Sequence, residues 1–234
     1  MKKCGLVALT LIVLAIPVFA QATSAPNPAQ IGVDTAQQAL KEISVSKFED
    51  PGMWRVFMPI DEGVIESRRF AGAPADRKPI PDEQKLGIAG EDKYVLGVKA
   101  QFFRRGDASI FVEPTRPLAI PGITKTVSVW VVGRNFNSML KLVIQDQFGN
   151  VDVLDMGLMN FTGWRQLTVA IPPNIQQRDV HYPGRGGISV LGFIIKPNML
   201  ETYGSYYIYF DDLRAVTDLF ADLSRNKDDI PDTW

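Results

Sequence analysis

Residues 165–171, Arg-Gln-Leu-Thr-Val-Ala-Ile, alternate apolar side chains with polar or small ones. Successive side chains of a β-strand point to opposite faces, so Leu167, Val169 and Ile171 fall on one face. This period of two is typical of a strand with one buried and one solvated face. The stretch therefore predicts a half-buried strand in an antiparallel sheet.

Similar short stretches, rich in β-branched and aromatic residues, recur along most of the chain between Gly, Pro, Asn or Asp. The pair Gly149-Asn150 lies between two alternating runs and predicts a tight hairpin. About ten or more closely spaced strands favour an all-β fold, an antiparallel β-sandwich of jelly-roll type. We expect further strands at 53–58, 63–70, 94–103, 109–113, 127–132, 140–144, 150–158, 188–195 and 206–210. The expected core includes Val129, Trp130, Leu142, Ile144, Leu167, Val169, Ile171, Phe193 and Ile208.

The N-terminal part of the chain differs from this pattern. Residues 1–20 join Lys2 and Lys3 to an apolar run that is short for a membrane span, which predicts a secretory signal peptide cleaved after Ala20. Residues 21–44 form an N-terminal segment with a short helix over 34–44, capped by Asp34. The helical spacing is that of Ala36, Ala39, Leu40 and Ile43.

The rest of the chain, residues 45–222, is expected to be one sandwich domain. Residues 71–93 have no sustained period and several prolines, which indicates a long surface loop that either contacts a partner or is simply exposed. One or two helical turns are expected at 217–223, and a charged tail follows at 223–234.

Charge and cysteine content exclude several function classes. The 234 residues contain 25 Lys and Arg against 26 Asp and Glu, a net charge of −1, so nucleic acid would find no general attraction. Cleavage of residues 1–20 also removes Cys4, the single cysteine, and with it any disulfide or thiolate site. After cleavage we expect no membrane insertion.

Candidate catalytic residues are scarce. The single histidine, His181, lies in a turn-forming context near Gly184, Gly186 and Gly187, which lack the Gly-Lys-Ser/Thr of a phosphate loop. No Gly-x-Ser-x-Gly elbow occurs, so the sequence offers no nucleophile and base for an enzyme.

Two pairs of acidic residues, Glu49-Asp50 and Asp211-Asp212, stand at the ends of expected strands. If the first and last strands are neighbours, these four carboxylates meet, and carboxylate oxygens are the ligands that Ca²⁺ prefers. The sequence thus offers a structural calcium site at Glu49, Asp50, Asp211 and Asp212, and no other cofactor. Ordinary surface carboxylates with Arg214 as counter-charge are the alternative.

Exposed aromatic and polar residues are the expected contacts with a partner. Tyr207 and Tyr209 face away from Ile208 and can form a platform for a ligand or another protein. Together with residues of two loops, the expected contact set is Arg134, Asn135, Phe136, His181, Tyr182, Tyr207 and Tyr209.

Several of these stretches occur in an order that resembles the FlaA family, the outer-layer or sheath proteins of spirochaetal periplasmic flagella. The resemblance runs from about Phe48 to Asp222 and rests on Phe48-Glu49-Asp50 with Trp54, on residues 116–122, 128–135, 160–164, Ile171-Pro172 and on residues 206–214. It implies a non-enzymatic coat protein in the periplasm that binds laterally to a flagellin-type filament core, beside other sheath proteins, and tunes filament stiffness or curvature for motility. A secreted carbohydrate-binding sandwich module is the alternative, since fold alone does not separate the two.

Overall fold

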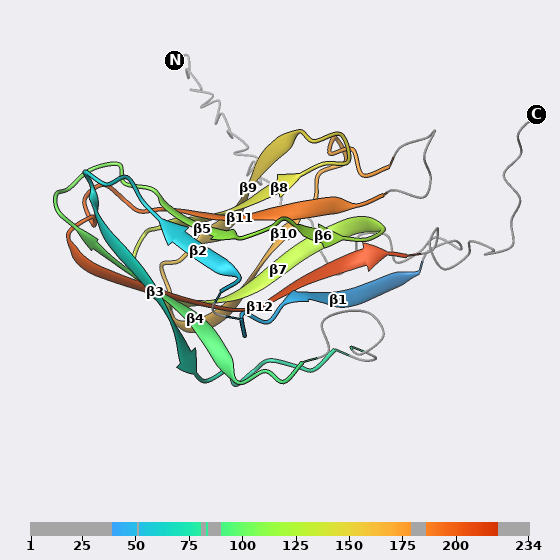
Figure 1. Cartoon of the computed structure of the whole chain (residues 1–234), viewed down its shortest axis with the longest axis horizontal. Helices are drawn as coiled ribbons and strands as arrows, with labels where there is room; N and C mark the ends of the chain where they lie inside the picture. Colours follow the sequence, from blue (N-terminus) through green and yellow to red (C-terminus); the bar gives the residue numbers. More distant parts are fainter. Residues whose placement is uncertain (1–38, 51, 81–82, 84–89, 179–185, 220–234) are drawn as a thin grey trace, which may run out of the picture.

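Twelve β-strands form from the residues that the computed structural model describes, which are 39–50, 52–80, 83, 90–178 and 186–219 (Figure 1). The strands are β1 (Leu40–Ser46), β2 (Trp54–Phe57), β3 (Gly63–Ala71), β4 (Tyr94–Phe102), β5 (Ile110–Pro114), β6 (Leu118–Ile120), β7 (Ile123–Arg134), β8 (Met139–Gln145), β9 (Val151–Leu158), β10 (Thr162–Ala170), β11 (Ile188–Lys196) and β12 (Gly204–Asp218). Each expected strand is present, most of them with small differences at their ends, but β7 begins four residues earlier than expected and β12 continues to Asp218, eight residues beyond its expected end. Only β1 and β6 were not expected as strands among the described residues.

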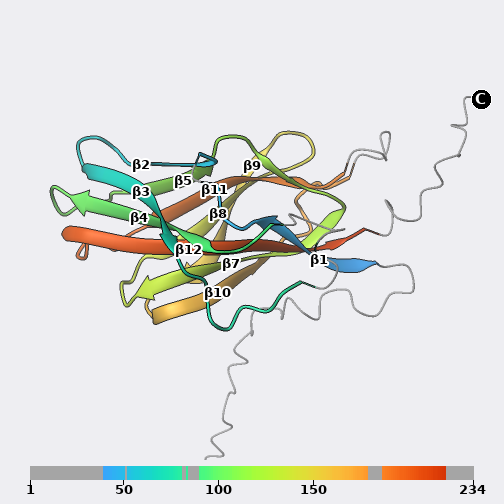
Figure 2. The same cartoon turned by 60° about the horizontal axis from the view of Figure 1, so that its bottom comes forward.

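The strands form two antiparallel sheets packed face to face. Sheet A has the order β10-β7-β12-β4-β3, with β1 paired to the end of β12, and sheet B has the order β2-β5-β11-β8-β9, with β6 paired to β11. Figure 1 shows sheet B above sheet A, and Figure 2 shows the same two layers after a turn of 60°. The predicted all-β antiparallel sandwich is confirmed.

The core lies between the sheets and is centred on aromatic rings. Trp54 of β2 stacks on Phe48 and Phe193, with ring centroids 4.5 and 6.1 Å apart, and Phe193 of sheet B meets Phe210 of sheet A at 5.4 Å. Of the expected core residues, Val129, Leu142, Ile144, Ile171, Phe193 and Ile208 are buried.

Trp130 was wrongly placed in the core. In β7 the side chains of Val127, Val129 and Val131 are fully buried, so alternation turns Trp130 to the outer face, where it is half-buried. Leu167 and Val169 do face the core, but they are only partly buried because β10 is the edge strand of sheet A.

The two expected helices are contradicted where the structure describes their residues. Residues 40–44 belong to β1, which pairs with residues 214–218 of β12, and residues 217 and 218 belong to β12 itself. This long-range ladder outweighs the local helical spacing, since propensity is a weak prior against tertiary pairing. Residues 34–38 and 220–223 of these predictions lie outside the described residues.

The hairpin predicted at Gly149-Asn150 joins β8 to β9. Gly149 has a φ of 91°, a left-handed conformation that favours glycine. Asp146 holds the turn, because its Oδ1 accepts hydrogen bonds from the backbone N–H of Phe148 and of Asn150, both at 2.8 Å.

The segment between β3 and β4 runs along the outer side of sheet A, as both views of the fold show where it is described (Figures 1 and 2). Pro74 and Ile80 are buried, and the carbonyl oxygen of Lys78 between them accepts a hydrogen bond from Arg214 of β12. The described residues of the predicted 71–93 loop therefore cover the sheet instead of extending freely into solvent.

Candidate functional site

Strand β12 changes partner at the predicted acidic site. Residues 204–210 pair with β4 and residues 213–218 pair with β1, while the register against β7 shifts between Asp211 and Arg214. Asp212 lies in this bulge with a φ of 51°, which is uncommon for any residue but glycine. The bulge places Asp211, Asp212 and Arg214 beneath the segment that covers sheet A.

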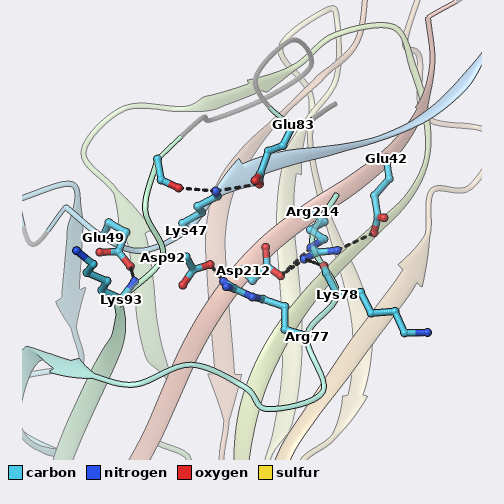
Figure 3. A network of polar contacts seen from close by, with 11 residues as sticks. Glu42, Lys47, Glu49, Arg77, Lys78, Glu83, Asp92, Lys93, Asp212 and Arg214 are labelled. Atoms are coloured by element: carbon cyan, nitrogen blue, oxygen red, sulfur yellow. Dashed lines mark hydrogen bonds and ion pairs between the residues drawn. The ribbon is translucent and has the colours of Figure 1, made fainter. Parts of the chain in front are cut away.

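Arg214 is the centre of a buried polar network, shown in Figure 3. Its Nε donates to Oδ2 of Asp212 at 2.7 Å, and its Nη2 forms an ion pair with the same oxygen at 2.6 Å. Nη2 donates to the carbonyl oxygen of Lys78 at 2.6 Å. A longer ion pair of 3.5 Å joins its Nη1 to Glu42 of β1. Arg214 therefore links β12 both to β1 and to the covering segment.

Lys47 and Glu49 hold the return of the same segment. The Nζ of Lys47 donates to the carbonyl oxygen of Gly90 at 2.8 Å and pairs with Glu83 at 3.0 Å. Oε1 of Glu49 accepts the backbone N–H groups of Lys93 and Tyr94 at 2.6 and 2.7 Å. The chain enters β4 directly from these contacts.

Asp211 lies beside this network without joining it. Its side chain is 0% exposed, and among the described residues neither carboxyl oxygen has a hydrogen-bond partner. Burial raises the pKa of Asp211 to about 7, and the charge of Asp212 and then that of Glu49 add to the increase, while Arg77 and the nearby backbone N–H of Asp212 oppose it. Arg77 itself forms an ion pair with Asp92 (Figure 3).

These contacts leave no calcium donor set at Glu49, Asp50, Asp211 and Asp212. The carboxylate of Asp212 is bound to Arg214, that of Glu49 to two amides, and Asp50 is exposed and accepts the N–H of Gly52 at 2.8 Å. Within the described ranges, no group of three or more His, Cys, Asp or Glu side chains could hold a metal ion. The alternative of surface carboxylates is wrong for Asp211 and Asp212, which are buried, although the pairing with Arg214 was anticipated.

Three of the expected partner contacts come together on the outer face of sheet A. The guanidinium of Arg134 lies 5.6 Å from the ring centroid of Tyr209, and Tyr207 is 41% exposed on the same face. Phe136 instead turns inward and meets Tyr206 edge-on at 5.3 Å. Asn135 is exposed in a left-handed turn, and His181 and Tyr182 lie outside the described residues.

A shallow groove crosses the outer face at Tyr207 and Tyr209, with a volume of about 200 Å³. We call it the outer groove. It is lined chiefly by Glu66, Arg68 and Phe70 of β3, Gly97 and Lys99 of β4, and Tyr207 and Tyr209 of β12.

A second exposed surface was missed by the sequence analysis. It lies at the end of the sandwich formed by the loops at 58–62, 103–109, 135–138 and 197–203, which we call the loop end. It presents large apolar side chains that are between 58% and 90% exposed: Ile60, Phe103, Met199, Leu200 and Tyr203. No periodic pattern marks them, because they lie in turns rather than in strands.

Hydrogen bonds tie the loops of this end together. Arg104 pairs with Asp61 at 2.9 Å and with Glu62 at 2.8 Å, which links the first two loops. The hydroxyl of buried Thr202 accepts a hydrogen bond from the backbone N–H of Gly106 at 2.9 Å. The carboxylate of Glu201 accepts hydrogen bonds from the backbone N–H of Asn137 at 2.7 Å and from its side-chain amide at 2.8 Å. The exposed apolar side chains are thus carried by loops fixed to one another.

Comparison with protein families gives one match that covers most of the chain. The family model for FlaA, described as flagellar filament outer layer protein, matches residues 19–226. Within the described part of the chain, no helix is long and apolar enough to span a membrane.

Two curated relatives carry similar descriptions. A flagellar filament outer layer-like protein of Brachyspira hyodysenteriae is 38% identical over 208 residues, covering 89% of this chain and 93% of the relative. The flagellar filament outer layer protein of Spirochaeta aurantia is 29% identical over 115 residues, which are 46% of this chain and 34% of that protein.

The solved structures with a similar arrangement of strands include carbohydrate-binding modules of low sequence identity. TmCBM61, solved with β-1,4-galactotriose, is 13% identical with a TM-score of 0.39, and the match covers 74% of this chain and 99% of that module. A family 11 module of Clostridium thermocellum is 9% identical with a TM-score of 0.43 and covers 76% and 97%.

Proposed function

Because this chain belongs to the FlaA family of flagellar filament outer layer proteins, we propose that it coats a flagellin-type filament core by lateral binding. The observation that carries the proposal is the family match over residues 19–226, together with a relative matched over 93% of its length. The coat would alter the stiffness or curvature of the filament without turning over a substrate. The alternative of a secreted carbohydrate-binding module has no comparable support as the function of the whole chain.

The loop end is the surface that suits this contact best. Exposed apolar patches rimmed by polar groups mark interaction sites, and preorganised loops lose less entropy on binding. The predicted contact Asn135 belongs to this end, whereas Tyr207 and Tyr209 lie beside it on the outer face of sheet A. Repetition along a filament would add avidity to a modest single contact.

Export is part of the same proposal. A coat on a periplasmic filament must leave the cytoplasm, and the basic start and apolar run of residues 1–20 are suited to a signal peptide cleaved after Ala20. N-terminal sequencing of the protein from its native cell tests this step, and a retained Met1 on the abundant species would contradict it.

Co-sedimentation with purified filament cores tests the contact. Leu200→Ser and Tyr203→Ser each remove an exposed apolar side chain whose full burial is worth about 1.5–3 kcal/mol, so binding should weaken roughly tenfold to a hundredfold. Phe148→Ser is the control, because Phe148 is also a large exposed apolar residue, at 59% exposure, but lies on the β8–β9 hairpin. Equal binding by all three variants would exclude the loop end, and failure of the wild-type chain to sediment would contradict the coat function.

A further inference from the structure

The outer groove is built from two cross-strand rows of side chains. Tyr207 of β12 lies opposite Lys99 of β4, which lies opposite Glu66 of β3. In the next row, Tyr209 lies opposite Gly97, which lies opposite Arg68. Each row therefore runs from a tyrosine of β12, across a residue of β4, to a charged residue of β3.

Glycine at position 97 makes the floor of the groove. A Cβ there would lie 2.5 Å from the ring of Phe70 and 2.9 Å from the ring of Tyr209, so only glycine lets both rings lie over the strand. The two rings meet edge-on with centroids 5.5 Å apart. Neither contact extends the core, since both rings lie on the solvent side of sheet A.

The polar side chains of the groove offer both donors and acceptors with little net charge. Glu66 pairs with Arg68 at 3.2 Å and with Lys99 at 3.5 Å, so the three charges partly cancel. All three side chains stay accessible to water and keep unused hydrogen-bonding capacity. Such a lining suits a neutral ligand with many hydroxyl groups better than a phosphate or a strongly acidic peptide.

The shape of the surface favours an elongated ligand of small units. The groove of about 200 Å³ adjoins a second hollow of about 320 Å³ along β3 and β4, and both are lined by Glu66 and Lys99. Both hollows are open along the face of the sheet, whereas a drug-sized ligand usually lies in a pocket that encloses most of its surface. A peptide strand would need free backbone groups, which sheet A offers only along the outer edge of β3 and not across the floor of the groove, where β4 is paired on both sides.

We propose that the outer groove binds a chain of neutral sugar units. The apolar face of a sugar ring packs on Tyr207 and Tyr209, while Glu66 and Lys99 exchange hydrogen bonds with its hydroxyl groups. This site is separate from the loop end and does not depend on the coat function. It would let one subunit hold a filament at one surface and a saccharide at another.

Titration of the full chain with chitotriose, cellotetraose and β-1,4-galactotriose, followed by ¹H–¹⁵N NMR, tests the proposal. At least one of these neutral oligosaccharides should shift the amide signals of Gly97 and Lys99. Tyr207→Ala should weaken that binding tenfold or more, and Tyr203→Ala on the loop end should leave it unchanged. Glu66→Gln keeps the shape of the groove and should also weaken binding. It serves as the test if Tyr207→Ala proves unfolded.

The results that overturn the proposal differ from those that overturn the coat function. Absence of shifts at Gly97 and Lys99 with all three oligosaccharides would exclude a saccharide site in the groove. Wild-type affinity in both Tyr207→Ala and Glu66→Gln would exclude it as well. Shifts at these amides with an acidic peptide alone would assign the groove to a protein partner instead. Co-sedimentation with filament cores should remain normal in Tyr207→Ala and weaken in Tyr203→Ala, whatever the oligosaccharides show.

Discussion

Replacing Asp211 with Asn should make the protein more stable at neutral pH than the wild type. Asp211 is fully buried, neither oxygen has a partner among the described residues, and its pKa is raised to about 7 by burial and by the charge of Asp212. Against the ordinary value of 3.8, the rise is about three pKa units, which corresponds to roughly 4 kcal/mol at 1.36 kcal/mol per unit. Asparagine has nearly the same shape and no charge to bury.

The sign of the effect follows from proton binding. Between about pH 4 and pH 7 the folded wild type holds a proton on Asp211 that the unfolded chain has lost. The contribution of this group to stability is therefore complete below pH 4 and falls as the pH rises to about 7. Asp211→Asn has no such loss, so its advantage over the wild type grows through this window and then stays constant.

Urea unfolding of both proteins at intervals from pH 4.5 to pH 8.5 measures the difference. The gap in unfolding free energy should widen by about 3 kcal/mol across this range, since about 1 kcal/mol of the total is already lost at pH 4.5, and other carboxylates cancel between the two proteins. Asp212→Asn is the contrasting variant: it leaves Arg214 buried without its main partner and should cost about 3–5 kcal/mol. A constant gap between wild type and Asp211→Asn across this pH range would refute the reasoning.

Two further predictions concern packing and are checked by chemical unfolding at one pH. Leu142→Ala, at a position with 0% exposure, should lower the free energy of unfolding by about 2–5 kcal/mol. Leu167→Ala should cost clearly less, because Leu167 lies on edge strand β10 and is only partly buried. Equal losses would contradict the position of β10 at the edge of sheet A. Gly133→Ala should cost about 1–3 kcal/mol or more, because its Cβ would lie 2.2 Å from the carbonyl oxygen of Phe161, while Gly90→Ala, with open space around it, should stay within about 0.5 kcal/mol.

Alternation and turn residues were enough to predict the sandwich, because each strand carries its own period of two. Strand β10 is the clearest case, with Leu167 and Val169 facing inward as expected. β1 could not be found in this way, because it is held as a strand by pairing with β12, which lies far away in the sequence. Leu40, for example, pairs with Asp218. Trp130 shows a related limit, because a continuous apolar run does not indicate which alternate residues face the core.

The sequence grouped Glu49, Asp50, Asp211 and Asp212 as one ion site, whereas in the structure Asp212 is bound to Arg214 and Glu49 to two backbone amides. The sequence showed acids after an aromatic strand and suggested that the strand ends near Phe210, with its carboxylates free for an ion. In the structure β12 continues to Asp218 through a bulge, which brings Arg214 back to the side of Asp212. A bulge and the covering segment are tertiary features, so neither the ion pair nor the burial of Asp211 follows from local spacing.

The buried ion pairs are better explained by position than by stability. Desolvation offsets much of the attraction between buried charges, so the pair of Arg214 and Asp212 adds little over an apolar contact of the same shape. What an apolar contact lacks is direction, and Arg214 binds one particular carbonyl oxygen, that of Lys78. The covering segment begins at Gly72, whose N–H donates to the carbonyl oxygen of Lys93. Gly72 lies two residues after Phe70, which forms part of the wall of the outer groove. The network therefore holds the covering segment over the bulge. Tyr207 and Tyr209 keep part of their surface accessible on the uncovered part of the outer face, with Gly97 buried beneath the rings of Phe70 and Tyr209.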